Sequence, residues 1–430
     1  MEKLRQSALL GERMYINRLQ NGLTCYIIPR KDYVGQSAMV CVNYGSADAR
    51  FELEGREFAP PSGIAHFLEH KMFEDEQLNI FDEFVKLGAS VNAYTNVHST
   101  AYYFSCNDMF YDNLRLLLRL VTLPHFTDEN VEKEKGIIWQ EIGMYDDNPF
   151  WRAYMNMQHA MYSHSSVRDS IVGDVESIRR ITKGDLQQAY GAFYHPSNMA
   201  LVCVGRFARE EVYRIARKAF VGAPKQADVK RLRDHEPPEV AESFVSSGMS
   251  LSKPMFSLGF KEDVGSVSSS DQRLPKTVTR KAAATKVLMD VLAGQSSELF
   301  NHMYRSGLVD TPLSLEYISG RGFGQAVFGG VSGEPEKARE RILHEIEKVR
   351  QNGADSARFR QILNKHMGRF FRLFNSIEAV RNLQADLFAA GADIDIFGMT
   401  EAYGELRAED LDGRLRELFR GDNHVLSVVR

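Results

Sequence analysis

The chain has 430 residues, of which 43% are hydrophobic and 26% are charged, with a net charge of −4 and an isoelectric point near 6.3. These values are typical of a soluble globular protein with about two to four domains. The sequence offers no basic stripe for a nucleic-acid partner. Its first residues lack the apolar core of a secretory signal peptide, and no run of 18 apolar residues predicts a membrane span.

The elements of the first half can be taken in chain order. The expected strands are 23–28, 37–44, 89–95 and 100–105, and the expected helices are 61–73, 80–87, 109–121 and one that follows residue 126. Thr127 is expected to cap this last helix, because acidic residues follow it in the first turn. Pro149 is expected to end the helix, since proline disfavours helical backbone at the preceding residue.

The composition changes near the middle of the chain. Residues 221–242 contain one glycine, three prolines and many charged side chains, which is typical of a linker. We therefore predict an N-terminal domain at 1–222, a linker at 223–242 and a C-terminal domain at 243–430.

The two halves resemble each other when they are aligned at one fixed offset. Asp185 then matches Asp410, and Asn198 matches Asn423. In both places the pattern predicts a capped helix, a turn and a closing strand. We therefore predict an internal duplication that gives two similar α+β domains.

The segment Gly63-Ile64-Ala65-His66-Phe67-Leu68-Glu69-His70 carries the clearest chemical signal. On a helix, His66 and His70 lie about 40° apart on one face, so both imidazoles can reach one metal ion. Zinc accepts neutral imidazole and carboxylate ligands. Glu69 lies near the same face, where a carboxylate can take a proton from a water that the metal activates.

A third ligand is expected from the helix that follows residue 126. Glu134 and Glu141 are seven residues apart and so share a face, about 10 Å from each other along the axis. One of them can bind the metal while the other reaches the edge of the site. The spacing alone leaves open which residue does which.

The alternative is that the two histidines bind no metal. Two histidines at i and i+4 more often lie on a surface or cap a helix. Here Glu69 lies between them, the neighbouring residues are apolar, and burying the pair without a metal would be costly. The other histidines of the first half have no partners at ligand spacing and are expected to be structural or exposed: His98, His125, His159, His164 and His195.

The four cysteines predict the redox setting. Cys25, Cys41, Cys106 and Cys203 form no Cys-x-x-Cys pair, and three of them lie in β-like runs. Buried free thiols are therefore expected, rather than disulfides or a thiolate zinc site. This favours a reducing, cytoplasmic location.

His66-x-x-Glu69-His70 is the H-x-x-E-H pattern of the inverzincins. The chain resembles the pitrilysin and insulin-degrading enzyme family of zinc metallopeptidases, and it is most similar to the mitochondrial-processing-peptidase subfamily and its short bacterial members. The matching stretches are GIAHFLEHKMFE, GASVNAYTNVHSTAYYF, VEKEKGIIWQEIGMYDDNP and FYHPSNMALVCVG. They cover most of the first half, whereas the second half matches mainly in plan.

The resemblance implies a role for each candidate residue of the metal site. It makes His66, His70 and Glu141 the ligands of one Zn²⁺ per chain. It makes Glu69 the general base and Glu134 a second carboxylate that supports the site.

The resemblance also implies a fold and a mode of substrate binding. The fold would be two homologous α/β-sandwich domains, each an antiparallel-rich sheet backed by helices, which close like a clam shell. The strand with Asn92, Ala93 and Tyr94 would be an edge that pairs with an extended peptide substrate.

The second half departs from the family pattern. Family members that work in pairs often carry an Arg and a Tyr there, which contact the substrate. Alignment on Gly307 places Met303 and Asp310 at these positions, while Tyr304 and Arg305 are out of register. The resemblance therefore predicts a homologous, zinc-free partner subunit that supplies the Arg/Tyr clamp.

The predicted function is that of a zinc endopeptidase that cleaves peptides or small unfolded proteins, as the catalytic subunit of a heterodimer. Two alternatives stay open. One is a non-catalytic scaffold of the same fold, like the core subunits of respiratory complexes. The other is a maturation peptidase dedicated to one ribosomally made precursor peptide.

Overall fold

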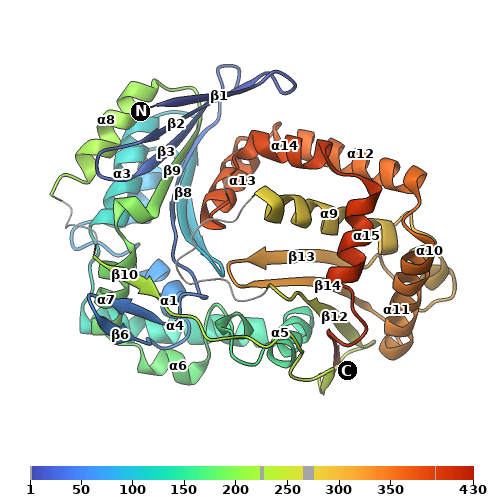
Figure 1. Cartoon of the computed structure of the whole chain (residues 1–430). Coiled ribbons are helices and arrows are strands. Elements are labelled where there is room, and N and C mark those ends of the chain that lie inside the picture. Colours follow the sequence, from blue (N-terminus) through green and yellow to red (C-terminus); the bar gives the residue numbers. More distant parts are fainter. Residues whose placement is uncertain (1, 223–226, 265–275, 393) are drawn as a thin grey trace. The chain divides into compact units, whose positions relative to one another are not determined.

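The computed structural model describes residues 2–222, 227–264, 276–392 and 394–430, so residues 223–226 of the predicted linker lie outside the described part. Contacts divide the chain into two compact units (Figure 1). Unit 1 comprises Met1–Ile142, Ser170–Leu232 and Phe371–Phe397, and unit 2 comprises Gly143–Asp169, Arg233–Phe370 and Gly398–Arg430. Each unit combines a sheet with helices, which confirms the predicted two-domain α+β fold.

Unit 1 is built on a seven-stranded sheet with the order β1-β2-β3-β9-β4-β8-β7. Its strands are β1 (Lys3–Ser7), β2 (Glu12–Arg18), β3 (Thr24–Pro29), β4 (Gln36–Val42), β7 (Ala89–Thr95), β8 (Thr100–Cys106) and β9 (Met199–Gly205). Only the pair β3–β9 is parallel among these described strands. A small second sheet contains β5 (Phe51–Leu53), β6 (Arg56–Phe58) and β10 (Val229–Arg231).

The helices of unit 1 lie on both faces of the large sheet. They are α1 (Ile64–Lys71), α2 (Ile80–Lys86), α3 (Phe110–Thr122), α4 (Asp128–Asp146), α6 (Val175–Arg180), α7 (Lys183–Phe193), α8 (Arg209–Ala219) and α13 (Ile377–Ala389), with a 3-10 turn η2 (Pro196–Asn198). Figure 1 shows α3 and α8 on one face and α13 on the other. The apolar residues of α3 recur at helical spacing and are buried, which explains its place against the sheet.

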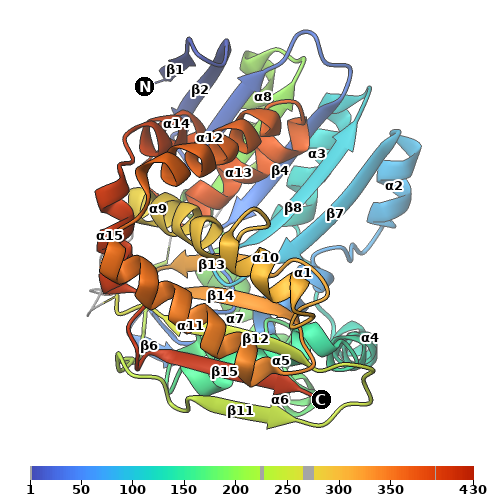
Figure 2. The same ribbon diagram turned by 90° about the vertical axis from the view of Figure 1, so that its right-hand side faces the viewer.

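Unit 2 is built on a five-stranded sheet with the order β11-β15-β12-β14-β13. Its strands are β11 (Phe244–Ser247), β12 (Met255–Lys261), β13 (Ser314–Gly320), β14 (Phe323–Val331) and β15 (His424–Val429). Its helices are α5 (Pro149–Met161), η1 (Ser166–Arg168), α9 (Lys276–Ala293), α10 (Glu298–Arg305), α11 (Pro335–Asn352), α12 (Ser356–Leu373), α14 (Ile396–Gly404) and α15 (Ala408–Glu417). Figure 2 shows α11 lying across β12 and β15, which it contacts.

Each half of the chain contains one helix that packs on the sheet formed by the other half. Helix α5 packs on β12 at Gly259, where an added Cβ would lie 2.4 Å from both Met157 Sδ and Met161 Cε. Helix α13 packs on β4 and β9, and its fully buried Arg381 donates a hydrogen bond to Ser37 Oγ. The two compact units are therefore not the two contiguous halves of the sequence.

The two units share one order of elements. Strands β3-β9-β4-β8-β7 correspond to β11-β15-β12-β14-β13, with the parallel pair at the same place in each sheet. Asn198 Nδ2 donates to the carbonyl of Phe193 at 2.9 Å, and Asn423 Nδ2 donates to the carbonyl of Leu418 at 2.7 Å. The offset that aligns the two halves thus joins side chains with the same structural role, as an internal duplication requires.

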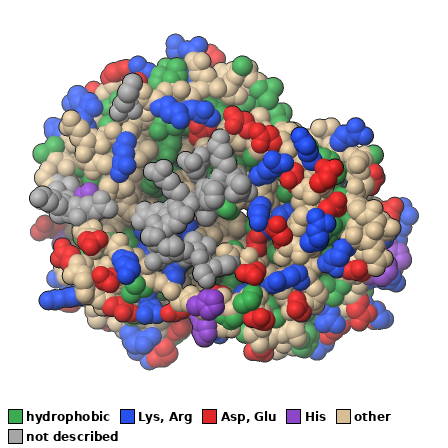
Figure 3. All heavy atoms as spheres, in the orientation of Figure 1, with side chains coloured by type: hydrophobic (Ala, Val, Ile, Leu, Met, Phe, Trp, Pro, Cys, Tyr) green, Lys and Arg blue, Asp and Glu red, His purple; other side chains and the backbone are tan. Residues whose placement is uncertain are grey.

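The structure contains the strands and helices that the sequence predicts for the first half. Thr127 Oγ1 accepts a hydrogen bond from the Asn130 amide at 3.1 Å, as expected of a cap, and α4 ends before Pro149. In the described residues, no helix has the length and apolar character needed to cross a membrane. Acidic and basic side chains are interspersed on the face drawn in Figure 3.

Candidate metal centre

Helix α1 starts at a position that only glycine fills easily. Gly63 has a φ of +87°, and an added Cβ would lie 2.7 Å from the carbonyl oxygen of Val172. From this fixed start, the helix buries Ile64, Phe67 and Leu68 in the core. The predicted start near residue 61 therefore moves to Ile64, and His66 and His70 come to one side of the helix.

Replacing Gly63 with alanine is expected to destabilise the fold by about 1–3 kcal/mol, because the left-handed backbone is strained and the methyl group has no space. Thermal unfolding measures the loss. Gly55→Ala is a matched control, since Gly55 has a φ of +80° but no atom within 4 Å of its added Cβ. Equal losses in both variants would contradict the argument from crowding.

His66, His70 and Glu141 form the one group of at least three potential ligand side chains found among the described residues, with ligand atoms within 4.8 Å of one another. Glu141 Oε1 lies 3.6 Å from His66 Nε2, and Glu141 Oε2 lies 3.6 Å from His70 Nε2. The ligand atoms of a tetrahedral zinc ion lie about 3.4 Å apart. The donor types and their separations therefore fit zinc.

Burial keeps the first imidazole uncharged. His66 is 7% exposed, and burial followed by the nearby charge of His70 lowers the pKa of His66 to about 3. A metal ligand must be the neutral imidazole. The protein thus holds His66 in the protonation state that a metal ion requires.

Glu134 contacts the second imidazole from the side opposite Glu141. Its Oε1 lies 3.0 Å from His70 Nδ1, which leaves His70 Nε2 directed to the site. Burial alone would lower the pKa of His70, but the hydrogen bond with Glu134 and the surrounding carboxylates raise it. The structure thus gives Glu134 and Glu141 different positions, a distinction that their helical spacing left open.

Lys71 is a site residue that the sequence interpretation missed. Its side chain is fully buried, and Nζ lies 2.7 Å from Glu74 Oε1, 3.0 Å from the Asn130 carbonyl and 3.5 Å from Glu134 Oε2. It therefore ties α1 to α4 next to the candidate ligands. The sequence gives no sign that this lysine is buried, because its partners on α4 are distant in the sequence.

Glu69 lies in the same site and is 8% exposed. Burial raises the pKa of this carboxyl group, and the hydrogen bond that Thr95 donates at 2.7 Å opposes the shift. A raised pKa makes a carboxylate a stronger base. Thr95, at the end of β7, was not among the predicted site residues.

Strand β7 is the last strand of its sheet and forms one wall of the site. Asn92 and Ala93 line a cavity of about 560 Å³ together with Glu69 and His70. Tyr94 is not among the lining residues, and its ring lies 6.2 Å from the ring of Tyr103. An edge strand beside a reactive centre can pair with an extended peptide through main-chain hydrogen bonds.

The positions aligned with the Arg/Tyr clamp lie in or after α10. Met303 is fully buried, and Asp310 pairs with Lys253 Nζ at 2.6 Å. Tyr304 is 54% exposed. The structure therefore places no Arg or Tyr at the two aligned positions.

Comparisons with known proteins agree on one family. Residues 37–175 match the family described as insulinase (peptidase family M16), and residues 180–366 match the peptidase M16 inactive domain. The uncharacterized zinc protease YmfH of Bacillus subtilis is 35% identical over 98% of this chain and 97% of its own. The beta subunit of the mitochondrial-processing peptidase of Caenorhabditis elegans is 27% identical over 50% of this chain and 45% of its own.

Solved structures give the same result. A putative M16-like peptidase from Alicyclobacillus acidocaldarius has a TM-score of 0.93 and 36% identity, over 99% of both chains. A protease from Helicobacter pylori has a TM-score of 0.80 over the full length of both chains. Its 19% identity supports a common fold alone.

Proposed function

The chain belongs to the insulinase (M16) family of peptidases, and from that premise we propose that it is a zinc-dependent endopeptidase that cleaves peptides or small unfolded proteins. The observation that carries the proposal is the convergence of His66 Nε2, His70 Nε2 and the Glu141 carboxylate beside the buried Glu69. Such a group can bind a hydrolytic metal ion. In a scaffold without a metal ion, burying these ionisable side chains would cost folding free energy.

Each residue then has a defined task. His66, His70 and Glu141 would hold one zinc ion per chain, which would supply Lewis-acid chemistry towards a water molecule and a carbonyl group. Glu69 takes a proton from the attacking water and passes it to the leaving amine. Glu134 orients His70 through Nδ1.

The substrate-binding part of the proposal rests on the edge strand. Asn92, Ala93 and Tyr94 lie on β7, whose outer side faces no other strand in the described part of the chain. An extended peptide can bind there through its main chain, which demands little of its sequence. We therefore expect an unstructured peptide to be cleaved and a folded protein of the same composition to resist.

The direct test measures zinc content and the hydrolysis of a quenched unstructured peptide by the purified chain. The proposal predicts about one zinc ion per chain and hydrolysis that a chelator abolishes. Absence of zinc after purification without chelators, and after an attempt at reconstitution, would contradict the proposal and favour the scaffold alternative.

We also propose that a homologous, zinc-free subunit completes the enzyme. Support comes from the aligned positions Met303 and Asp310, which provide neither Arg nor Tyr, and from a relative that is named as a subunit. The expected result is a zinc-loaded chain with little activity alone that gains activity when a homologous subunit is added. A fully active homodimer would contradict this part of the proposal.

Zinc uptake by the metal-free protein is expected to weaken as the pH falls. The pKa of His70 is raised, so below that value a proton occupies the ligand and zinc must displace it. The pKa of His66 is lowered to about 3 by burial, so near neutral pH no proton on His66 competes with zinc. The affinity should therefore be constant above the raised pKa of His70 and fall about tenfold per pH unit below it.

A competition titration with a chromophoric chelator between pH 8 and pH 5.5 measures this dependence. In Glu134→Gln the hydrogen-bonded carboxylate is gone, so the fall should begin at a lower pH than in the wild type. The same pH profile in both proteins would show that Glu134 does not set the pKa of His70.

Two further expectations complete the proposal. The shared order of elements in the two units supports the prediction that 1–222 and 243–430 are homologous domains. A cytoplasmic location is supported by Cys25, Cys41, Cys106 and Cys203, which are all buried free thiols.

A further inference from the structure

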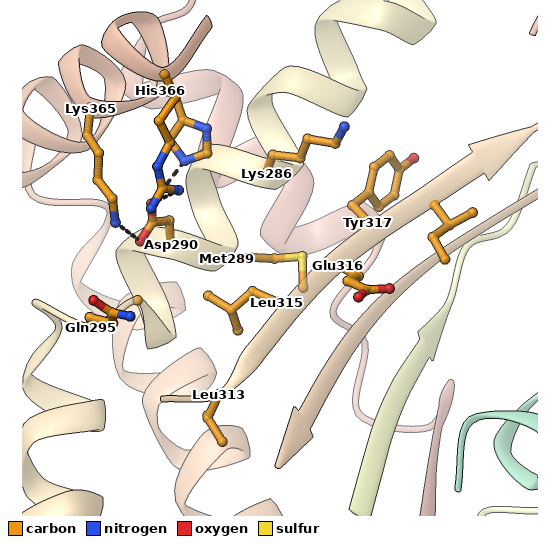
Figure 4. Close-up of a pocket in the computed structure, with 13 residues that line it drawn as sticks. Lys286, Met289, Asp290, Gln295, Leu313, Leu315, Glu316, Tyr317, Lys365 and His366 are labelled. Atoms are coloured by element: carbon orange, nitrogen blue, oxygen red, sulfur yellow. Dashed lines mark hydrogen bonds and ion pairs between the residues drawn. The ribbon is translucent and has the colours of Figure 1, made fainter. Parts of the chain in front are cut away.

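Unit 2 contains a cavity at the place that corresponds to the metal centre of unit 1. The shared order of elements pairs α9 with α1, α12 with α4 and β13 with β7. Helices α9 and α12 and strand β13 line a cavity of about 440 Å³ (Figure 4). The duplication has therefore kept the pocket, while the residues that line it have changed.

The helix that corresponds to the glutamate-bearing α4 is basic in this cavity. It contributes Lys365, His366 and Arg369, which gather around Asp290 of α9. Lys365 Nζ lies 2.8 Å from Asp290 Oδ1, and His366 Nε2 lies 3.0 Å from Asp290 Oδ2 (Figure 4). Where unit 1 holds carboxylates for a cation, unit 2 thus holds cations around one internal carboxylate.

Around Asp290 the positive charge exceeds the negative charge. Lys365 and Arg369 both lie against this one carboxylate, and Lys286 and Glu316 also line the cavity. Arg369 reaches no closer than 3.9 Å to Asp290, and its side chain is 56% exposed. Its planar group of donors is therefore available at the mouth of the cavity, in a geometry that suits a carboxylate.

The lining also contains a group of apolar side chains, beside the polar Gln295 and Tyr317. Met289, Leu313, Leu315 and Ile318 lie in the same cavity. An apolar wall beside a small excess of positive charge fits a monoanion with a hydrocarbon side chain better than a doubly charged phosphate.

We propose that this cavity binds a carboxylate that carries an apolar group, and that Arg369 and Lys365 contact its oxygens. The C-terminal residue of a peptide and a free small organic acid share this chemistry. Both oxygens of Asp290 already have partners, so the internal carboxylate occupies part of the cationic site in the absence of ligand. This site is independent of the peptidase proposal, because no residue of the metal centre takes part in it.

Calorimetric titration of the zinc-loaded full chain tests the proposal with three probes. N-acetyl-leucine is expected to bind, and the uncharged N-acetyl-leucinamide is expected to bind at least about tenfold more weakly, because charge-assisted hydrogen bonds are lost. Acetyl-Gly-Gly-Leu distinguishes the two sources. Tighter binding than N-acetyl-leucine points to a peptide C-terminus, and equal or weaker binding points to a small acid.

Two variants change the affinity in opposite directions. Arg369→Gln should weaken the binding of N-acetyl-leucine about tenfold, while Asp290→Asn should tighten it, because the competing internal carboxylate is gone. A gain of affinity cannot result from misfolding. Arg360→Gln is the matched control, since Arg360 is exposed on the same helix and does not line the cavity.

The opposite results would overturn the proposal. Equal binding of the acid and the amide would show that no carboxylate is recognised. Unchanged binding of N-acetyl-leucine in both Arg369→Gln and Asp290→Asn would place the ligand elsewhere, for example on the zinc ion of unit 1.

Discussion

Glu69→Gln is expected to lower the hydrolysis of an unstructured peptide by about 10²–10⁴-fold, which is the usual contribution of general acid–base catalysis, and to leave the zinc content unchanged. Glutamine keeps the size of the side chain and can still pair with Thr95, but it cannot accept the proton of the attacking water. The zinc content should persist because Glu69 is not among the converging ligand atoms of His66, His70 and Glu141. The kinetic loss should appear in kcat more than in KM.

Measurements on the purified variant separate this outcome from a structural one. Zinc content, thermal unfolding and steady-state hydrolysis are compared with those of Glu76→Gln, whose side chain is exposed beyond α1. Glu76→Gln should behave like the wild type in all three. A Glu69→Gln protein that keeps its zinc and cleaves at the wild-type rate would remove Glu69 from the mechanism.

The local part of the candidate site is predictable from the sequence. The spacing of His66 and His70 on one helix brings their rings to a centroid distance of 4.6 Å. The position of Glu141, two turns beyond Glu134, allowed either glutamate to be a ligand. Only the docking of α4 against α1 separates their positions, because it brings Glu134 to Nδ1 of His70 and Glu141 to Nε2 of both imidazoles.

The long-range part of the site is not predictable in the same way. Lys71 and Glu134 are 63 residues apart, and a lysine next to a motif normally remains in solvent. The sequence likewise gives no sign that α5 and α13 each pack on the sheet formed by the other half of the chain. The sequence predicts Pro149 only as the end of one helix, whereas it also begins α5, which packs on the sheet of unit 2.

The two halves share contacts at the start of a helix, although different side chains line their cavities. Thr182 and Arg407 occupy matching places in the two halves, where Asp185 and Asp410 accept hydrogen bonds from the backbone amides of Thr182 and Arg407 at 2.8 Å. Only Thr182 completes a capping box, because its hydroxyl accepts from the Asp185 amide at 3.2 Å, whereas arginine has no acceptor. These contacts position secondary structure and do not depend on a metal ion. The cavity of unit 2 that corresponds to the candidate metal centre is lined by other side chains.

Glu141→Gln and Glu134→Gln are expected to differ sharply, although the two residues lie on one helix and undergo the same substitution. Glu141→Gln removes a charged ligand, so zinc should be lost on dialysis and hydrolysis should fall to background. Glu134→Gln removes only the partner of His70 Nδ1, and loss of such an outer partner typically lowers metal affinity or activity about 10–100-fold. The measurements are zinc affinity by chelator competition and peptide hydrolysis at saturating zinc.

Saturating zinc separates the two roles. It should restore most of the activity of Glu134→Gln, because the three ligands remain and only the orientation of His70 is weakened. It should restore little in Glu141→Gln, because a neutral amide is a poor replacement for a carboxylate on zinc. If Glu134→Gln lost its zinc while Glu141→Gln kept it, the roles of the two glutamates would be reversed, and the docking of α4 on α1 would need another register.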